Sequence, residues 1–391
     1  MDNGQPKIRP SSRTELVQEY YFSHKLKQID EMRKAGANII NLGIGSPDLA
    51  PAQSVIEKLC EAAKLPDSHG YQSYNGIPAL REAFAEWYQK YFDVRLNPEN
   101  EILPLIGSKE GIMHISMAFL NYGDEVLVPN PGYPTYTSAT KLVGGKVRLY
   151  NLKANNNWQP DFEELENSDL SKVKMMWVNY PNMPTGVKGD RKLFEKLIAF
   201  GHKHNILICN DNPYSFILNQ KYLSVLSVDG AKGVALELNS MSKSHNMAGW
   251  RIGMVAGHGQ YISGIVKVKS NMDSGMFHPM QVAAVEALRS PESWYELNNK
   301  TYSARRKLVE NIMLKLNCTF DTNQSGLFLW GKISEKYKSG EELIESLLHK
   351  ANIFITPGMV FGDQGNKYIR ISLCATENKL KEAIERLAYF E

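Results

Sequence analysis

The sequence predicts an α/β protein whose central sheet is mostly parallel and is covered by helices on both faces. Short, unbroken apolar runs alternate with segments of helical period, and such runs are typical of strands buried on both sides. The expected strands are residues 125–129, 174–181, 205–211, 233–239 and 253–257. The clearest helices between them are residues 109–121 and 191–205. In such sheets ligands bind beyond the carboxyl ends of the strands, so we look for a site there.

The length and a change of pattern near residue 290 predict two domains. The chain has 391 residues, which is too many for one compact core. After Pro291 the pattern predicts one long amphipathic helix over residues 292–317, followed by short strands and helices. Another helix is expected near the start, over residues 23–36. We therefore expect a large domain of residues 49–290 and a smaller, discontinuous α+β domain of residues 1–48 and 291–391.

Composition and charge argue against several classes of protein. The net charge of +3, without any block of like charges, does not favour binding to nucleic acid. No apolar run approaches the roughly 18 residues of a membrane helix, and the polar start lacks a secretory signal, so we expect no membrane contact and a cytoplasmic location. Four cysteines without metal-binding spacing predict free thiols and no metal site. They are Cys60, Cys209, Cys318 and Cys374.

Small and aromatic residues mark the ends of the first strands. Gly107, Ser108 and Lys109 lie between a strand and a helix. Free backbone N–H groups at a helix start, opened by a glycine, can bind a phosphate, although an ordinary strand-to-helix turn has the same composition. Tyr133 follows the next strand in a proline-rich turn. Its ring could stack on a planar ligand or simply pack.

Charged residues lie at the ends of two further predicted strands. Asp211 closes an otherwise apolar strand, with Tyr214 three residues later, and a carboxylate at that depth needs a cation or several hydrogen bonds. The next strand leads to Ser240 and Lys243. Burying a lysine is costly unless chemistry requires it. Taken singly, each position also has a structural explanation, as a capping aspartate or a surface lysine.

Two arginines complete the group of candidate site residues. Arg251 lies eight residues after Lys243, and Arg370 is embedded in a predicted strand of the small domain. A buried guanidinium suits a carboxylate bidentately, or a structural ion pair. A lysine becomes nucleophilic when it is partly desolvated and near cations, because both effects lower its pKa. An anion cradle, a stacking ring, an acid, an amine and arginines together match a carbonyl cofactor with a phosphate and a ring nitrogen, which is pyridoxal phosphate.

From "NLGIGSPD" to "YIRISL" the chain resembles the class I/II aminotransferases, which are fold-type I pyridoxal-phosphate enzymes. The resemblance implies a large domain with a mostly parallel seven-stranded sheet between helices. It also implies that Lys243 forms the Schiff base with the cofactor and moves a proton at the substrate Cα. Asp211 would keep the ring nitrogen protonated. Tyr214 would bond the ring oxygen, and Tyr133 would stack on the ring.

The same resemblance implies contacts at both ends of the cofactor. The phosphate would be bound by Gly107, Ser108, Lys109, Ser240 and Arg251. Arg370 would bind the substrate α-carboxylate, helped by the backbone of Gly45, with Ile44 beside it. Tyr71, five residues before Gly76, corresponds to a tyrosine that reaches the phosphate of the partner subunit. A homodimer with shared active sites is therefore expected.

One position departs from the family's pattern. In "NMPTG", Met183 stands where an asparagine usually donates a hydrogen bond to the ring oxygen of the cofactor. A thioether cannot donate that bond, so we expect the ring oxygen to depend more on Tyr214. Asn179 and Asn182 lie nearby in the sequence, and either could compensate.

The expected reaction is the exchange of an amino group between an L-amino acid and a 2-oxo acid. A carbon–sulfur β-lyase on the same scaffold is the alternative, because a cofactor and a fold do not fix the reaction. A catalytically silent binding module is a further alternative, which Lys243, Asp211 and Arg370 together argue against.

The substrate is open at this stage. The resemblance is nearest to a subgroup that includes aspartate, aromatic, methionine and diaminopimelate aminotransferases, and 2-oxoglutarate is the acceptor by family habit. Residues of the N-terminal segment are expected to line an apolar side-chain pocket. They are Tyr20, Tyr21, Phe22 and Ile44.

Overall fold

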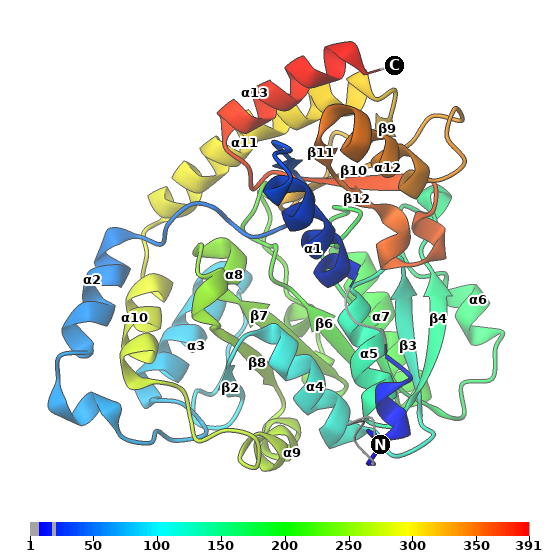
Figure 1. The fold of residues 1–391 in the computed structure, drawn as a ribbon. Helices are drawn as coiled ribbons and strands as arrows, with labels where there is room; N and C mark the ends of the chain where they lie inside the picture. Colours follow the sequence, from blue (N-terminus) through cyan, green and yellow to red (C-terminus); the bar gives the residue numbers. More distant parts are fainter. Residues whose placement is uncertain (1–7, 18–20, 391) are drawn as a thin grey trace, which may run out of the picture.

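The computed structural model describes residues 8–17 and 21–390, and its largest sheet has seven strands (Figure 1). Listed as they lie side by side, they are β2 (Ile102–Leu105), β8 (Gly253–Gly257), β7 (Ala235–Ser240), β6 (Leu207–Asp211), β5 (Val173–Val178), β3 (Glu125–Asn130) and β4 (Lys146–Asn151). Neighbouring strands are parallel except at β8, which runs antiparallel to β2 and β7. The expected α/β fold with a mostly parallel seven-stranded sheet is confirmed.

Helices cover both faces of this sheet. Along β3, Leu127 belongs to one buried cluster while Val126 and Val128 belong to another, because successive side chains on a strand point to opposite faces. The helices that contribute to the first cluster include α2 (Gln53–Ala62), α3 (Pro78–Phe92), α6 (Phe162–Glu166), α7 (Arg191–His204) and α10 (His278–Leu288). Those on the opposite face are α4 (Ser108–Phe119), α5 (Pro134–Leu142) and α9 (Gly259–Lys269).

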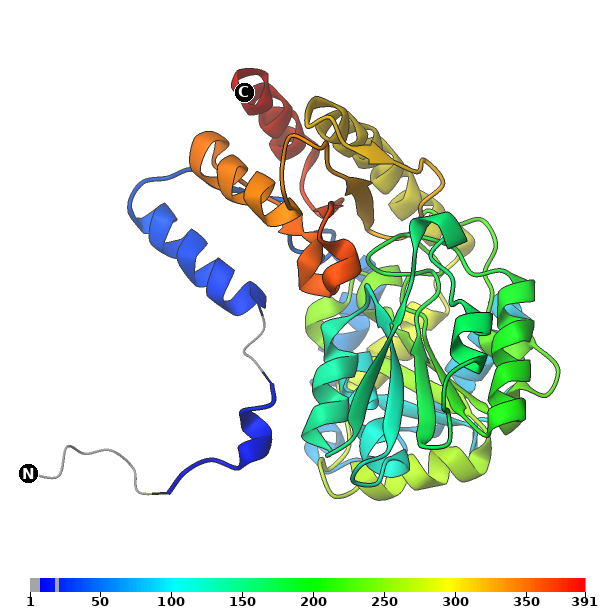
Figure 2. The ribbon, with the colours of Figure 1, turned by 90° about the vertical axis from the view of Figure 1, so that its right-hand side faces the viewer.

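A second sheet forms above the carboxyl ends of the large one (Figures 1 and 2). Its four antiparallel strands are, side by side, β12 (Thr356–Pro357), β13 (Tyr368–Ser372), β10 (Phe328–Lys332) and β9 (Thr319–Phe320). The helices that share its buried cluster are α1 (Tyr21–Lys34), α11 (Glu292–Lys315), α12 (Gly340–Ala351) and α13 (Glu377–Arg386). The short strands β1 (Ile40–Asn41) and β11 (Ile353–Phe354) pair in parallel beside it.

The N-terminal segment packs with the C-terminal part of the chain. Phe22 and Ile29 of α1 lie in the same buried cluster as side chains of α11, α12 and α13. The helix ends at Lys34, two residues before its expected end, because Gly36 adopts φ +98°, which terminates the helix at low cost only for glycine. The expected long helix is α11. The boundary at residue 290 stays a prediction.

An ion pair between a buried arginine and a more exposed aspartate fixes this N-terminal segment against α11. Arg305 Nη1 donates to Asp48 Oδ1 at 2.6 Å, and Arg305 Nη2 donates to Asp48 Oδ2 at 2.9 Å. Nη1 also donates to the carbonyl oxygen of Leu373 at 3.1 Å. A bidentate arginine–carboxylate pair holds its partners in one geometry. The residues just before Asp48 are therefore held in a fixed position. Within the described part of the chain, no helix is both long and apolar enough to cross a membrane.

Leu236→Ala tests the core beneath the large sheet. Leu236 lies on the interior strand β7 and is fully buried, so its replacement is expected to lower the free energy of unfolding by about 2–5 kcal/mol. Leu297→Ala, on α11 where the side chain is 64% exposed, should change it by less than about 0.5 kcal/mol. Denaturant titration of both variants measures the difference. Equal losses would contradict the assignment of Leu236 to the core.

Candidate active site

One cavity of about 330 Å³ lies at the carboxyl ends of β6 and β7 and the beginnings of α4 and α5. The expected site residues in its lining are Ile44, Gly45, Ser108, Lys109, Tyr133, Asp211, Tyr214, Ser240, Lys243, Arg251 and Arg370. The other lining residues are Phe22, Ser46, Tyr136, Asn179, Met183, Pro213, Ser242, Ala248 and Phe328. Segments far apart in the sequence therefore meet here, at the strand ends where the sequence placed them.

Three of the expected positions that the structure describes lie elsewhere. Gly107 precedes the lining residue Ser108 and packs under Arg251. Tyr71 is 93% exposed on the surface, and its contact with a partner subunit stays a prediction. The expectation that Tyr21 lines the cavity is wrong: adjacent residues of a helix point about 100° apart, and Tyr21 lines a neighbouring groove while Phe22 lines the cavity. Tyr20 lies outside the described residues.

Lys243 sits in α8 (Met241–Ser244), a single turn that follows β7 directly. The side chain of Ser240 accepts a hydrogen bond from the backbone N–H of Ser242, which starts the turn at the strand end. Lys243 Nζ donates to the carbonyl oxygen of Gly45 at 2.5 Å. The pKa of Lys243 is lowered to about 8, mainly by burial; the cations Arg370 and Arg251 contribute to this decrease, and Cys374 opposes it. About half of the amine is therefore unprotonated near pH 8.

Asp211 ends β6 in the same cavity. Its Oδ2 accepts a hydrogen bond from the Tyr136 hydroxyl at 2.9 Å, whereas its Oδ1 is buried without a hydrogen-bond partner among the described residues. Burial raises the pKa of Asp211 to about 6; the bond from Tyr136 opposes this effect, and Glu237 adds to it. A buried acceptor of this kind calls for a donor within the cavity.

The beginning of α4 and Arg251 form an anion-binding end. Gly107 adopts φ +81°, and a Cβ at that position would lie 2.3 Å from Arg251 Nη2. Only glycine therefore lets the guanidinium approach the helix start. Ser108 and Lys109 line the cavity in the first turn, whose free N–H groups favour an anion. Arg251 Nη1 is oriented by a bond to the carbonyl oxygen of Ala248 at 3.0 Å.

Arg370 lies at the opposite end, on β13. Its Nη2 donates to the carbonyl oxygen of Gly43 at 2.9 Å. Its guanidinium carbon lies 3.8 Å from the ring centroid of Phe328 and 4.6 Å from that of Phe361, close enough for cation–π attraction. These contacts hold the planar group in a fixed orientation at the cavity wall.

Met183 lies beside this arginine, and both nearby asparagines bond within the same turn. Its Sδ is 3.2 Å from Arg370 Nη1. The Asn179 side chain donates to the backbone oxygen of Asp211 and accepts from the Met183 N–H at 2.7 Å. Asn182 is bonded to Thr185 and to the Asn179 carbonyl, outside the cavity lining. Both side-chain amides therefore bond within the turn, and compensation by either asparagine stays a prediction.

Three tyrosines surround Asp211. Tyr133 caps α5, and Tyr214 is buried; burial raises the pKa of both hydroxyls, so they stay protonated donors at neutral pH. The sequence reasoning missed Tyr136, although it lies in the same "PNPGYPTY" segment as Tyr133. Tyr136 stacks on Trp177 with centroids 4.9 Å apart, which fixes its hydroxyl toward Asp211. Its position one helical turn after Tyr133 was the available signal.

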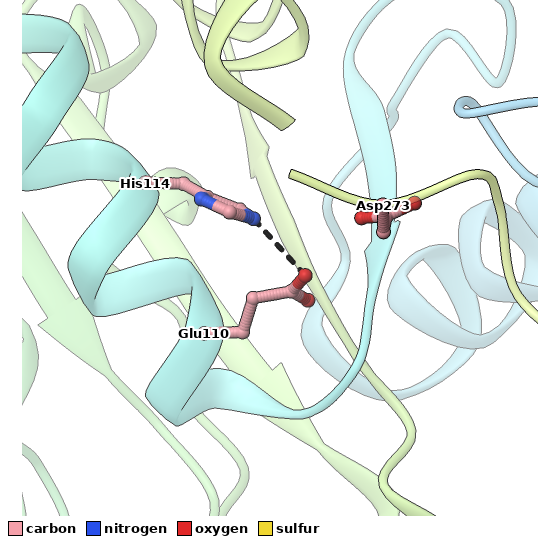
Figure 3. Close-up of side chains that lie close together, drawn as sticks. All are labelled: Glu110, His114 and Asp273. Atoms are coloured by element: carbon pink, nitrogen blue, oxygen red, sulfur yellow. Dashed lines mark ion pairs between the residues drawn. The ribbon is translucent and has the colours of Figure 1, made fainter. Parts of the chain in front are cut away.

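A second group of ionisable side chains lies behind the anion-binding end (Figure 3). Ligand atoms of Glu110, His114 and Asp273 all lie within 4.8 Å of one another. A cation there is opposed by the fully buried Lys269, whose Nζ is 2.5 Å from Asp273 Oδ2, and by the positive end of α4. Glu110 also accepts the backbone N–H of Ile106. We therefore interpret the group as an anchor that fixes the loop before Gly107.

The fold and the position of the cavity define an α/β enzyme with its site at the carboxyl ends of parallel strands. Residues 37–387 match the family described as aminotransferase class I and II, and the chain belongs to this family. It is therefore an aminotransferase, and members of its family use pyridoxal phosphate. Amino-group transfer is favoured over the carbon–sulfur β-lyase and the silent module.

Relatives and solved structures agree with this assignment. The chain is 40% identical over 386 residues to an LL-diaminopimelate aminotransferase of Dehalococcoides mccartyi, covering 98% of this chain and 99% of the relative. A relative of the same name from Aquifex aeolicus is 38% identical over 379 residues, covering 96% and 98%. Substrate-bound BacF from Bacillus subtilis superposes with a TM-score of 0.93 at 34% identity, over 98% of this chain and 97% of that one. An aspartate aminotransferase double mutant from Thermus thermophilus gives 0.91 at 25% identity, over 98% and 100%.

Arg370→Met should raise the pH at which Lys243 becomes reactive. Deprotonation releases an amine as nucleophile, and removing a nearby cation raises the pKa, so the reactivity profile moves upward from its midpoint near pH 8. Amine acylation of the cofactor-free protein, followed by mass spectrometry of the Lys243 peptide, measures it. Arg289→Met, at an exposed ion pair with Glu86, is the control that leaves the profile unchanged. An unmoved midpoint in Arg370→Met would contradict the coupling.

Proposed function

We propose that this protein binds pyridoxal phosphate in the cavity and transfers the amino group of an L-amino acid to a 2-oxo acid through Lys243. The observation that carries the proposal is the pairing of Lys243 and Asp211 in one cavity, between an anion-binding helix start and Arg370. Burial lowers the pKa of the amine and raises that of the acid. Opposite pKa shifts of neighbouring groups are typical of acid–base sites.

The residues present fit this cofactor. The unpartnered Oδ1 of Asp211 suits a ring N–H, because a buried carboxylate oxygen needs a donor. The start of α4, with Ser240 and Arg251 beside it, suits a phosphate dianion. Bound there, the cofactor supplies a carbonyl carbon that condenses with amines and a protonated ring that accepts the electron pair of the substrate Cα.

The side chains of this chain bind and orient the substrate around that group. Arg370 binds the α-carboxylate, and its contacts with Gly43 and Phe328 fix the guanidinium beforehand. Lys243 takes up the proton that leaves the substrate Cα, a task suited to an amine with a pKa of about 8. Tyr214 donates to the ring oxygen, and Tyr133 packs on the ring. We take 2-oxoglutarate as the acceptor and the cytoplasm as the location.

A second copy of the chain is part of the proposal. Large apolar side chains are exposed on two adjacent segments, which are joined by a bond from the Gln72 N–H to the Ser274 carbonyl oxygen at 3.3 Å. These side chains are Tyr71, Tyr74, Met272 and Phe277. Exposed apolar groups gathered in this way mark an interaction surface. A second copy that covers them brings its Tyr71 to the phosphate end of the neighbouring site.

Spectroscopy of the cofactor-loaded enzyme tests the proposed function. Single L-amino acids, added without any 2-oxo acid, should convert the visible band of the bound cofactor to its amine form, and a 2-oxo acid should restore it. Lys243→Ala should still bind the cofactor through Arg251 and Asp211 but should lose the lysine-bound band and turn over at least 10³-fold more slowly, about 4 kcal/mol. Pyruvate and ammonia without the amine form, or a normal band in Lys243→Ala, would contradict the proposal.

Met183→Asn tests the unusual neighbour of Arg370. An amide that donates to the ring oxygen draws electron density from it and weakens its hold on the adjacent proton. The pH midpoint of the visible absorbance change in the loaded enzyme should therefore fall. Met117→Asn, at an exposed position of α4, is the control. If the midpoint is the same in both variants, Met183 does not face the ring oxygen.

A further inference from the structure

We infer that the preferred amino donor carries an apolar or aromatic side chain. The inference rests on the proposed function, because it assumes that the α-carboxylate binds Arg370 and that the α-amino group reacts near Lys243. Those two contacts place the donor's Cα between the two residues. The walls next to them then decide which side chain is accepted.

The walls around Arg370 are apolar. Phe22 from α1 lines the cavity, is only 7% exposed, and has its ring centroid 5.9 Å from the Arg370 guanidinium carbon. Ile44 and Phe328 line the same end, and Phe328 packs so closely on Gly45 that a Cβ there would lie 2.1 Å from its ring. With the Met183 thioether on the other side, the donor's side chain meets carbon and sulfur. Burial of an apolar side chain among such groups is favourable.

The charged side chains of the cavity lining lie away from the place where the donor's side chain would bind. Among the described lining residues the acid is Asp211, which lies at the ring-binding end and is bonded to Tyr136. Lys109 and Arg251 lie at the anion-binding end, opposite Arg370. A donor such as LL-diaminopimelate, named in the relatives, ends in an ammonium and a second carboxylate. Within the described lining near Phe22 no acid is available for that ammonium, and burying a charge without a partner is costly.

The experiment compares donors in the loaded enzyme without any acceptor. Each donor is added separately, and conversion of the bound cofactor to its amine form is followed in a single turnover. The apolar donors are L-phenylalanine, L-methionine and L-leucine; the charged donors are L-aspartate, L-glutamate and LL-diaminopimelate. The second-order rate constant of this conversion should be at least about tenfold higher for the apolar donors than for the charged ones. Faster conversion by LL-diaminopimelate or a dicarboxylate would overturn the inference and leave the proposed function intact. No conversion by any donor would overturn the proposed function itself.

Phe22→Ala identifies the residue that sets this preference. It should lower the ratio of kcat/KM for L-phenylalanine over L-alanine about tenfold, because the small donor does not reach the lost ring. A merely structural role would lower kcat/KM for both donors alike and keep the ratio, which would contradict the assignment. Phe119→Ala, on α4 where the ring packs against Tyr261, is the matched control that keeps the ratio.

Discussion

The site depends on the desolvation of Lys243. Water is excluded from this amine by the strand end that carries it and by the N-terminal segment, whose Gly45 carbonyl oxygen accepts a hydrogen bond from Nζ at 2.5 Å. Gly45 can approach because it has no side chain, and Phe328 occupies the space where one would be. The bidentate pair between Arg305 and Asp48 holds that segment in place. A lysine with a lowered pKa is thus a product of contacts made by three distant parts of the chain.

The same burial prepares the acid. Asp211 and Lys243 end neighbouring strands of one sheet, so the backbone ladder between β6 and β7 fixes their spacing. Tyr136, stacked on Trp177, satisfies one carboxylate oxygen and leaves the other for a ligand. A low-dielectric cavity therefore holds an amine with a lowered pKa beside an acid whose charge needs a donor. Rigid strands and a stacked ring supply this preorganisation, so little reordering accompanies ligand binding.

The chain differs from the usual pattern where its two sheets meet. Arg370 belongs to the second sheet, and it is held by Gly43, Phe328 and the thioether of Met183. The Arg370 end of the cavity is therefore more apolar than the Asp211 end. In the function that we propose, an amino acid binds with its charged groups toward Arg370 and Lys243 and its side chain toward carbon and sulfur.

The sequence by itself determined the sheet, its helices and most of the site. Apolar runs on strands must be covered on both faces, and polar residues that follow such strands collect at one edge; Lys243, Asp211 and Ser108 were found in this way. Only the tertiary structure decided that Phe22 and not Tyr21 enters the cavity, because helix rotation depends on packing. It likewise decided that Tyr136 bonds Asp211, that Asn179 accepts from the Met183 N–H, and that Glu110 and Asp273 meet. These contacts join residues whose separation along the chain carries no information about distance in the fold.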